Sequence, residues 1–553
     1  MNGSQWTWNV LKSLNVDTVF GIPGGAILPL VDAMALEGDA LTFIVTRHEA
    51  AAVHAADGYS RASGRIGVVL VTSGPGGTNV LTGLSTAMAD SVPLLVLIGQ
   101  VPTTLIGTDA FQEADLFTMT MPVVKHSWRI ADPNRIGPTL EEAVHMATHG
   151  RPGPVVVELP KDVQLAEVSE VSHWVAPAAN PWLPSISSLQ WARVRSLMRF
   201  CRRPLIYLGG GVTASGTAPM ARALAEHFKA PVVSTLMGLG VMPQQHPLFL
   251  GMVGMHGTWT ANHAVQDADL ILALGVRFDD RVTGRVTEFA PKAKIIHAEI
   301  DPAEIGKIVH CDIALNGDLR AILPKLKRIA PKREHRVWQR QLDAWRNEHP
   351  LRYRSSLTGL TVPQALEIIA RHLEPDHIVV TEVGQHQMWA ALYIPRSIPR
   401  RFISSGGLGT MGYGFPAAMG AQVGCPRQRV CLIAGDGSIQ MNLQEFATMT
   451  QYRLPIWTII MNNAGHGMVR QWQDLFHGQR RHGVLLENPD FVKLAAAFRI
   501  PGFSVGSAGA LAEALETMRT VDGPVLLEVF VDQDDHVYPM VPSGQPLSMV
   551  LEE

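Results

Sequence analysis

The sequence is poor in cysteine, and the few cysteines that it has do not form a metal or redox pair. Its 553 residues include four of them, Cys201, Cys311, Cys425 and Cys431, without any CxxC spacing. This argues against a disulfide-stapled secreted fold and against a cysteine-based zinc site. Cys425 and Cys431 border or enter an apolar run, so we expect buried thiols there.

Long apolar runs and an excess of charge of either sign are also missing. No window reaches the roughly 18 apolar residues that a membrane span needs. Lys and Arg total 46 against 49 for Asp and Glu, and this balance favours neither nucleic acid nor a membrane surface as a partner. The basic, Trp-containing segment 326–355 is expected to be a solvated helix and a linker. The first residues lack the features of a signal or transit peptide, so we expect a cytoplasmic protein.

What the sequence does contain is a repeated alternation of short apolar runs, glycine-rich turns and helical patterns. This alternation is typical of α/β domains with parallel strands, and a chain of this length needs more than one core. We predict three α/β domains, each a parallel sheet flanked by helices, over residues 1–167, 188–330 and 360–553. A Pro-, Ser- and Ala-rich segment, residues 168–188, is the expected linker between the first two.

The stretch 429–472 carries the strongest chemical signal. An apolar run at 430–434 ends at Gly-Asp-Gly, a helical pattern follows, and a second run at 456–461 ends at two asparagines. In such a βαβ unit ligands lie beyond the carboxyl ends of the parallel strands, where Asp436 and Asn463 both fall. A carboxylate and an amide oxygen suit Mg²⁺, which also binds phosphate oxygens, and glycines let backbone N–H groups approach a phosphate. A plain glycine turn stays open as the alternative for Gly-Asp-Gly alone.

The first third of the chain repeats this order of elements. An apolar run at 67–72 leads into Ser-Gly-Pro-Gly-Gly-Thr-Asn, then into a helical pattern and a proline-led run at 93–98. We therefore expect the two outer thirds to share one fold. Because the Asp–Asn motif occurs only in the later third, we expect the two domains to bind different ends of one cofactor.

Glu49 is the acidic residue of the first third that we select as functional. It follows an apolar run and opens a helical pattern of small residues, Ala50-Ala51-Ala52-Val53. A glutamate in the first turn of a helix is ordinarily a solvated group that the helix dipole favours. The apolar helix that follows it favours a chemical role instead.

The middle third is expected to be a further parallel domain whose strand ends suit a dinucleotide. Apolar runs at 204–208, 232–237, 270–274 and 295–300 lead into turns rich in Gly, Asp and Arg. A clean GxGxxG signature is missing, so a purely structural domain with glycine turns stays open as the alternative.

The motifs resemble those of one enzyme family along the whole chain. In chain order they are FGIPGG, RHEAAA, TSGPGGTN, GTDAFQE, GRPGPV, LPKD, GMHGT, RFDDR, IDPAEI, VGQHQMWA, SGGLGTMGYG, GDGS, NN and GMVRQWQ. They are similar to those of the acetohydroxyacid (acetolactate) synthase catalytic subunits, which are thiamine diphosphate enzymes, and most of all to the shorter bacterial anabolic form. The resemblance implies three α/β domains and the cofactors thiamine diphosphate, Mg²⁺ and FAD. It also implies the condensation of two 2-keto acids with loss of CO₂, a step of branched-chain amino acid biosynthesis.

The resemblance further implies which residues hold thiamine diphosphate. Glu49 would activate the cofactor through its aminopyrimidine ring, and Met411 would support its bent conformation. Further active-site residues of the first domain would be Gly25, Phe111, Gln112 and Lys161, and the pyrimidine-side loop would supply Thr72, Pro75 and Asn79. The diphosphate side would comprise Val383, Gly384, Gln385, His386, Gly409, Met411, Gly435, Asp436, Gly437, Ser438, Asn463, Gly465, Gly467 and Met468. Asp436, Asn463 and the backbone carbonyl of Gly465 would be the metal ligands.

FAD and the second keto acid would take the remaining sites. FAD, which performs no net redox step in this family, would lie along Gly209, Gly210, Gly211, Thr235, Leu236, Gly254, Met255, His256, Gly275, Arg277, Asp279, Arg281, Glu299, Ile300 and Asp318. Arg281 would bind the carboxylate of the acceptor, because a guanidinium matches a carboxylate; a structural salt bridge with a neighbouring aspartate is the alternative. Trp472 would favour 2-ketobutyrate over pyruvate as acceptor by packing on its extra methyl group.

The resemblance also implies an assembly. Glu49 and Asp436 are not expected to serve one cofactor within one subunit, so we expect a homodimer or homotetramer, with a separate small regulatory subunit. Two other functions stay open: a flavin-using pyruvate oxidase or 2-keto acid decarboxylase, and a non-catalytic nucleotide-binding paralogue. RFDDR together with RQWQ argues against the first, and the presence of Glu49, Asp436 and Asn463 against the second. His466, in a segment that varies among relatives, is assigned no role.

Overall fold

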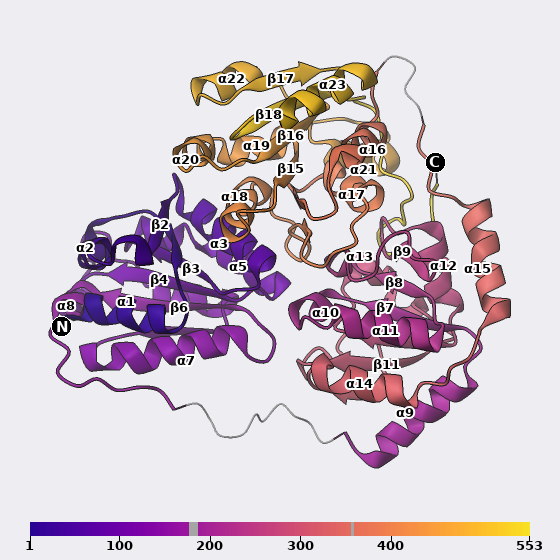
Figure 1. Ribbon diagram of the computed structural model, residues 1–553, viewed down its shortest axis with the longest axis horizontal. Helices are drawn as coiled ribbons and strands as arrows, with labels where there is room; N and C mark the ends of the chain where they lie inside the picture. The colour runs from indigo at the N-terminus through magenta and orange to yellow at the C-terminus, as the bar shows by residue number, and fades with distance from the viewer. Residues whose placement is uncertain (176–185, 355–358, 553) are drawn as a thin grey trace.

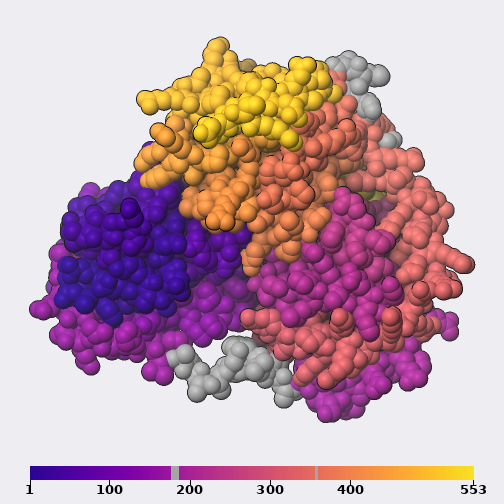
Figure 2. All heavy atoms as spheres, in the orientation of Figure 1, coloured from indigo at the N-terminus to yellow at the C-terminus, as the bar shows by residue number. Residues whose placement is uncertain are grey.

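Three parallel sheets of six strands each organise the protein. The computed structural model describes residues 1–175, 186–354 and 359–552, and the sheets contain β1–β6, β7–β12 and β13–β18. We call the parts built on these sheets the first, central and third domains. Helices flank each sheet (Figure 1), and the third domain lies across the other two (Figure 2). The predicted α/β fold with three parallel sheets is confirmed; of the expected linker, residues 176–185 lie outside the described part.

The first domain has the strand order β2-β1-β3-β4-β6-β5. Its strands are β1 (Thr18–Gly21), β2 (Thr42–Val45), β3 (Gly67–Val71), β4 (Leu94–Gln100), β5 (His126–Arg129) and β6 (Pro154–Pro160). Its helices are α1 (Gly3–Ser13), α2 (Leu28–Ala35), α3 (Glu49–Ser63), α4 (Pro75–Thr78), α5 (Leu81–Asp90), α6 (Leu116–Thr120), α7 (Ile136–Thr148) and α8 (Lys161–Leu165). The central strands β3, β4 and β6 are buried along their whole length, as continuous apolar runs in a parallel sheet should be.

The central domain has the order β12-β11-β10-β7-β8-β9. Its strands are β7 (Pro204–Leu208), β8 (Val232–Ser234), β9 (Phe249–Met252), β10 (Leu270–Leu274), β11 (Lys294–Glu299) and β12 (Ile313–Asn316). Its helices are α9 (Ser188–Phe200), α10 (Gly210–Ala214), α11 (Ala218–Phe228), α12 (Trp259–Asp267), α13 (Asp280–Thr283), α14 (Leu319–Ile329) and α15 (Arg336–Glu348). The run at 232–237 is a strand only as far as Ser234, because Leu236–Gly238 forms a 3₁₀ turn. The expectation of a solvated helix within 326–355 is only partly right, because one face of α15 is buried through Trp338 and Leu342.

The third domain has the order β14-β13-β15-β16-β18-β17. Its strands are β13 (Ile378–Thr381), β14 (Phe402–Ile403), β15 (Val430–Gly435), β16 (Trp457–Asn462), β17 (Gly502–Val505) and β18 (Val525–Phe530). Its helices are α16 (Val362–His372), α17 (Gln385–Tyr393), α18 (Gly414–Gly424), α19 (Asp436–Ile439), α20 (Glu445–Gln451), α21 (Gly467–Phe476), α22 (Phe491–Ala497) and α23 (Ala508–Arg519). Counted from its own first strand, this order is that of the first domain, which confirms that the outer thirds share one fold.

Helices α3 and α18 pack closely and join the first and third domains. Gly58 of α3 lies against the backbone of Ala417, and Gly420 of α18 lies against the carbonyl of Ala55, so neither position has room for a Cβ atom. Small side chains are therefore required on both helices. The alanine-rich pattern after Glu49 serves this contact, and the third domain thereby fixes the helix that Glu49 begins.

Candidate active site

The carboxyl ends of β15 and β16 bring Asp436 and Asn463 together. The two strands are neighbours and pair in parallel, with Gly435 opposite Met461. Asp436 is the first residue of α19, and Asn463 follows β16 directly. The side chains at 436 and 463 are 27 positions apart in the sequence, yet the parallel register places them at the same edge of the sheet.

Three oxygen atoms converge at this edge. Oδ1 of Asn463 lies 2.9 Å from the carbonyl oxygen of Gly465 and 3.2 Å from Oδ1 of Asp436. All three are acceptors, so the cluster lacks a proton between its members and fits a hard cation such as Mg²⁺. Without a cation, a rotated Asn463 amide would satisfy the group, because it would donate to both oxygens and accept from Nη2 of Arg470 over 3.1 Å.

Two asparagines outside the predicted set of site residues, Asn462 and Asn488, complete this cluster. Nδ2 of Asn488 donates to Oδ2 of Asp436 over 2.7 Å and to Oδ1 of Asn462 over 3.0 Å. The backbone N–H of Gly465 also donates to Oδ2 of Asp436, over 3.0 Å. Burial raises the pKa of Asp436, and these hydrogen bonds oppose the shift. Asn488 stands before a proline and far from the motif in sequence, so only the fold shows its role.

Two histidine rings cover the Gly-Asp-Gly turn. A Cβ atom at Gly435 would lie 2.8 Å from the ring of His386, and one at Gly437 would lie 2.9 Å from the ring of His466. Glycine is needed at both positions because the rings occupy the space of a side chain. His386 is buried, and burial lowers its pKa to about 4, so this ring is neutral near pH 7. His466, to which no role was assigned, therefore packs directly on the predicted diphosphate turn.

Met411 lies half-buried on the glycine-rich loop 404–413. Glu382, at the end of β13, accepts hydrogen bonds from the backbone N–H groups of Gly412 and Phe415, each over 2.9 Å. Burial raises the pKa of Glu382 to about 7, although the backbone donors work in the opposite direction. Glu382 lies outside the predicted set of site residues, and it fixes the chain directly after Met411.

Glu49 lies in the first domain beside the loop that follows β3. It is half-buried at the start of α3, and its Oε2 accepts a hydrogen bond from Nδ2 of Asn79 over 2.9 Å. On the same loop, Oγ1 of Thr72 accepts from the backbone of Ala26 over 3.2 Å. The structure thus brings Glu49, Asn79, Thr72 and the Gly24–Gly25 turn to one edge of the first sheet.

The other predicted residues of the first domain differ in exposure. Gln112 has a positive φ of 59° and packs against Gly74, whose Cβ would lie 2.9 Å from the Gln112 carbonyl. Phe111, on the same turn, is 88% exposed. Lys161 is half-buried at the start of α8.

The central domain presents buried polar atoms without protein partners where FAD was predicted. Among the described residues, these include Oγ of Ser234, Oγ1 of Thr235 and Nε2 of His256. Buried polar groups are normally hydrogen-bonded, so these atoms fit a polar ligand laid along the strand ends. Glu299, at the end of β11, is also buried, which raises its pKa to about 7. Asp318, in contrast, caps α14 and pairs with Arg320, and these bonds occupy its carboxylate.

Arg281 and Trp472 are both accessible. The Arg281 side chain is 59% exposed, and its Nε lies 3.8 Å from the exposed carboxylate of Asp280. Exposed pairs at this distance contribute little stability, so the salt-bridge alternative does not occupy the guanidinium. Trp472 stands on α21 and lines an open hollow of about 390 Å³ together with Val469, Gln473, His477 and Arg480.

Family comparisons agree with this division into three parts. The chain matches the N-terminal TPP binding domain of thiamine pyrophosphate enzymes over residues 1–119, their central domain over 192–326 and their C-terminal TPP binding domain over 382–529. The sites at the strand ends of the first and third domains agree with these matches. The chain is therefore an enzyme that depends on thiamine pyrophosphate, another name for thiamine diphosphate. The prediction of this cofactor is confirmed.

Relatives that match over the full length of the chain show to which thiamine diphosphate enzymes it belongs. The chain is 43% identical to the acetolactate synthase isozyme 2 large subunit of Escherichia coli K12, over all of both chains. It is 45% identical to the acetolactate synthase large subunit of Parasynechococcus marenigrum, over 99% of this chain and 90% of that one, and 42% identical to the E. coli isozyme 3 large subunit, over 98% and 96%. The chain belongs to the acetolactate synthase large subunits, as its motifs predicted. Among the described residues, no helix is long and apolar enough to cross a membrane.

Proposed function

We propose that the chain forms acetolactate at a site shared between a first domain and a third domain. The reaction takes pyruvate, removes CO₂, and joins the remaining two-carbon unit to the keto carbon of a second pyruvate or of 2-ketobutyrate. Bound thiamine diphosphate supplies a nucleophilic carbon that adds to the first carbonyl and holds the electron pair left by CO₂. The observation that carries the proposal is the oxygen cluster of Asp436, Asn463 and Gly465 at the ends of β15 and β16.

We assign the metal and diphosphate to this cluster. Asp436, Asn463 and the carbonyl of Gly465 would bind Mg²⁺, and the cofactor's phosphate oxygens would complete its coordination. The turn at Gly435 and Gly437 would place backbone N–H groups on the diphosphate. The ring of His386 is neutral near pH 7, so it would orient the turn without adding charge.

We assign the acid–base role to Glu49. Its carboxyl group would exchange a proton with the pyrimidine ring, which is general acid–base catalysis by a fixed carboxylate. Asn79 supports this role, because its amide holds Oε2 in place over 2.9 Å. Gly25, Gln112 and Lys161 border the same edge, where they would exclude water and orient the first keto acid.

Arg281 and Trp472 would recognise the acceptor. The exposed guanidinium of Arg281 would bind the acceptor carboxylate, and the ring of Trp472 would pack on its alkyl group. The central domain would hold FAD through Thr235, His256 and Glu299, whose buried polar atoms fit such a ligand. We further propose the domain limits 1–167, 188–330 and 360–553 as the units of this division.

Two subunits would build each active site. The contacts of Glu49 lie within the first domain, whereas those of Asp436 lie within the third. A homodimer or homotetramer would bring a first domain of one chain to a third domain of another, and would cover the exposed Phe111. The relatives are named large subunits, and we infer that a small regulatory subunit from a separate chain binds this one.

The test is acetolactate formation from pyruvate by the purified protein with thiamine diphosphate, Mg²⁺ and FAD. We expect activity in the parent and a loss of about 10²–10⁴-fold in Glu49→Gln, the range typical of a lost acid–base group. Glu141→Gln, on the outer helix α7, is the matched control and should keep full activity.

Other products would contradict parts of the proposal. Acetaldehyde or acetate in place of acetolactate would refute the acceptor roles of Arg281 and Trp472 and favour the decarboxylase or oxidase. No consumption of pyruvate, even with a cognate small subunit added, would refute the proposed function as a whole.

A further inference from the structure

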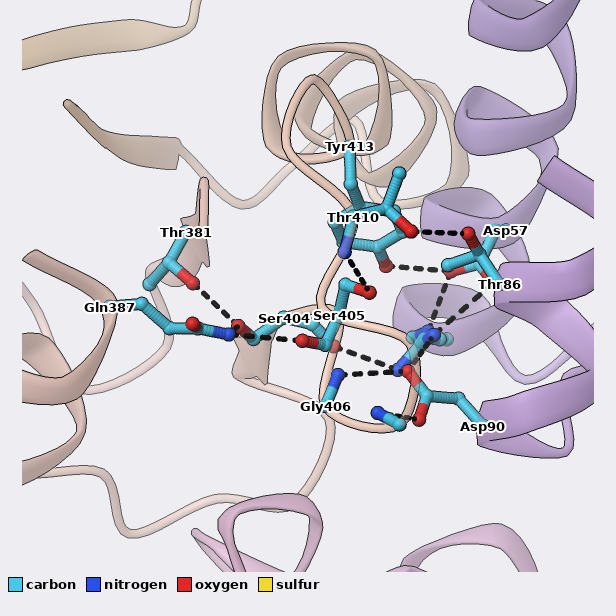
Figure 3. Close-up of polar contacts among 12 residues, drawn as sticks. Asp57, Thr86, Asp90, Thr381, Gln387, Ser404, Ser405, Gly406, Thr410 and Tyr413 are labelled. Atoms are coloured by element: carbon cyan, nitrogen blue, oxygen red, sulfur yellow. Dashed lines mark hydrogen bonds and ion pairs between the residues drawn. The ribbon is translucent and has the colours of Figure 1, made fainter. Parts of the chain in front are cut away.

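A buried ionic cluster of the first domain reaches into the third domain and contacts the loop that carries Met411. The loop 404–413 joins β14 to α18. Figure 3 shows it between two groups of side chains: Thr381 and Gln387 on one side, and Asp57, Thr86 and Asp90 from helices of the first domain on the other.

The cluster consists of one arginine and two aspartates. Arg61 of α3 donates from Nε and Nη2 to the two oxygens of Asp57, over 2.6 and 3.2 Å. The same Nη2 donates to Oδ2 of Asp90, the last residue of α5, over 2.8 Å. The Arg61 side chain is 10% exposed, and both aspartate side chains are fully buried.

The loop supplies the donors that this cluster lacks. Asp90 accepts hydrogen bonds from the backbone N–H groups of Gly406, over 3.0 Å, and Gly407, over 2.7 Å. The hydroxyl of Tyr413 donates to Asp57 over 2.6 Å. One cation faces two carboxylates here, so the remaining negative charge is stabilised by groups that belong to the loop.

Two further contacts fix the same side of the loop. Nη1 of Arg61 donates to the carbonyl of Ser404 over 3.0 Å. Oγ1 of Thr86, on α5, lies 2.8 Å from Oγ1 of Thr410. Met411 follows Thr410 directly, so the last anchor from the first domain precedes the methionine by one residue.

In the described part of the chain, third-domain side chains that bond the loop from outside reach its ends, and one bond within the loop joins the N–H of Thr410 to Oγ of Ser405 over 3.1 Å. Gln387 donates to Oγ of Ser404 and to the carbonyl of Ser405, over 2.7 and 3.0 Å, and Glu382 binds the N–H of Gly412. The N–H groups of Gly406 and Gly407 both donate to Asp90. The Thr410 hydroxyl bonds the hydroxyl of Thr86. Among the hydrogen bonds described here, those that reach the middle of the loop from outside it therefore come from the first domain.

Such a cluster is better suited to fixing a position than to adding stability. A buried ion pair costs desolvation that its attraction scarcely repays, whereas its directional hydrogen bonds select one arrangement. A loop with so many glycines has wide conformational freedom unless its backbone is held.

We propose that Asp90 and Arg61 are positioning residues that hold the middle of the loop 404–413, and so set Gly409 and Met411 against thiamine diphosphate. The inference rests on the proposed function for its effect on catalysis, and on geometry alone for its effect on the loop. The first domain of each chain would thereby determine the position of Gly409 and Met411 in the third domain of the same chain.

The test compares Asp90→Asn with Glu158→Gln. Glu158, on β6 of the same domain, is a fully buried carboxylate that pairs with Arg129 over 2.6 Å. Amide hydrogen exchange is measured on the full-length protein without cofactor, together with Tm and the half-saturating concentration of thiamine diphosphate in the acetolactate assay. In Asp90→Asn we expect faster exchange confined to the loop peptide. We also expect a half-saturating concentration about tenfold higher, the size expected for lost charge-assisted hydrogen bonds.

A neutral pair of variants covers the case in which Asp90→Asn does not fold. Thr86→Val removes the hydroxyl bond to Thr410. Thr120→Val removes an equivalent bond to Ser127, of 2.7 Å, elsewhere in the first domain. Each threonine also bonds the carbonyl four residues earlier in its helix. Thr86→Val should loosen the loop and raise the half-saturating concentration, while Thr120→Val should do neither.

Equal effects of the members of either pair, or faster exchange spread over the whole chain, would overturn the proposal. A parent protein that forms no acetolactate would refute the proposed function instead, and the exchange data would still decide whether the first domain holds the loop.

Discussion

Nδ2 of Asn488 donates to Oδ2 of Asp436 over 2.7 Å. The two residues are 52 positions apart in the sequence, and the bond leaves Oδ1 of Asp436 free to face Asn463 and the carbonyl of Gly465. Groups that orient a ligand in this way commonly matter nearly as much as the ligand itself. The oxygen cluster, which we propose as the Mg²⁺ site, is therefore larger than the motif that predicts it.

The first prediction concerns this bond. Asn488→Ala should weaken apparent Mg²⁺ affinity about 10–100-fold, the range typical when a group behind a metal ligand is removed, because the carboxylate of Asp436 loses its fixed orientation. A Mg²⁺ titration of thiamine diphosphate binding measures it. Asn134→Ala serves as control, since the described partners of the Asn134 side chain are Ser169 and Glu170, which follow the first domain. An unchanged titration in Asn488→Ala would exclude the role.

The sequence predicts the pair Asp436 and Asn463 but not Asn488, which orients Asp436, and the reason is physical. Strand ends and glycine turns are local features, so 430–434 and 456–461 suffice to place Asp436 beside Asn463. Asn488, by contrast, stands in an irregular segment whose path depends on tertiary packing. The same holds for Asp90 and Arg61, whose partners on the loop 404–413 lie more than 300 positions away.

The shared fold of the outer domains was predictable because it repeats in the sequence. The glycine loops at Gly74 and Gly435 each lead through helices to a proline-led run, and both domains have the same strand order. The end of β8 at Ser234 was not predictable, because the apolar run continues into a 3₁₀ turn. Periodicity cannot separate a strand from a buried turn of similar composition.

The second prediction concerns acceptor size. Trp472→Leu should lower the preference for 2-ketobutyrate over pyruvate about tenfold, since a single methyl or methylene group in an apolar site contributes roughly 1–3 kcal/mol. Competition between the two acceptors, with both products quantified, measures this ratio. Phe200→Leu, an exposed aromatic at the end of α9, is the control. If the ratio stayed constant in Trp472→Leu, another group would determine acceptor size.

The third prediction concerns the acceptor carboxylate. Arg281→Gln should raise the half-saturating concentration of acceptor about 10–100-fold, because a hydrogen bond to a charged group contributes about 1.5–3 kcal/mol. Release of CO₂ from the first pyruvate should change much less. Arg285→Gln is the matched control, since Arg285 is exposed and pairs with Glu288 over 2.6 Å. Equal losses in both steps would show that Arg281 acts on the whole site and not on the acceptor.

The fourth prediction concerns stability in acid. Burial lowers the pKa of His54 on α3 from 6.5 to about 3, and the nearby Arg61 and His48 act in the same direction. Its ring also packs edge-on against Tyr413, with centroids 5.4 Å apart. The unfolded chain binds the proton near pH 6.5, whereas the folded chain binds it only near pH 3. Protonation therefore favours the unfolded state, and stability falls as the pH drops below about 6.5.

The slope of this effect is about 1.4 kcal/mol per pH unit for one group. Between pH 6.5 and 5.0, His54 alone should therefore cost about 2 kcal/mol of the free energy of unfolding. His54→Leu fills a similar volume without titrating, so its Tm should fall less than that of the parent between pH 7.5 and 5.0. His482→Leu, at an exposed histidine, should follow the parent. If His54→Leu and the parent lost Tm equally, His54 would not be the source of the acid sensitivity, which would then lie in other groups such as the buried His256, His297, His335 and His386.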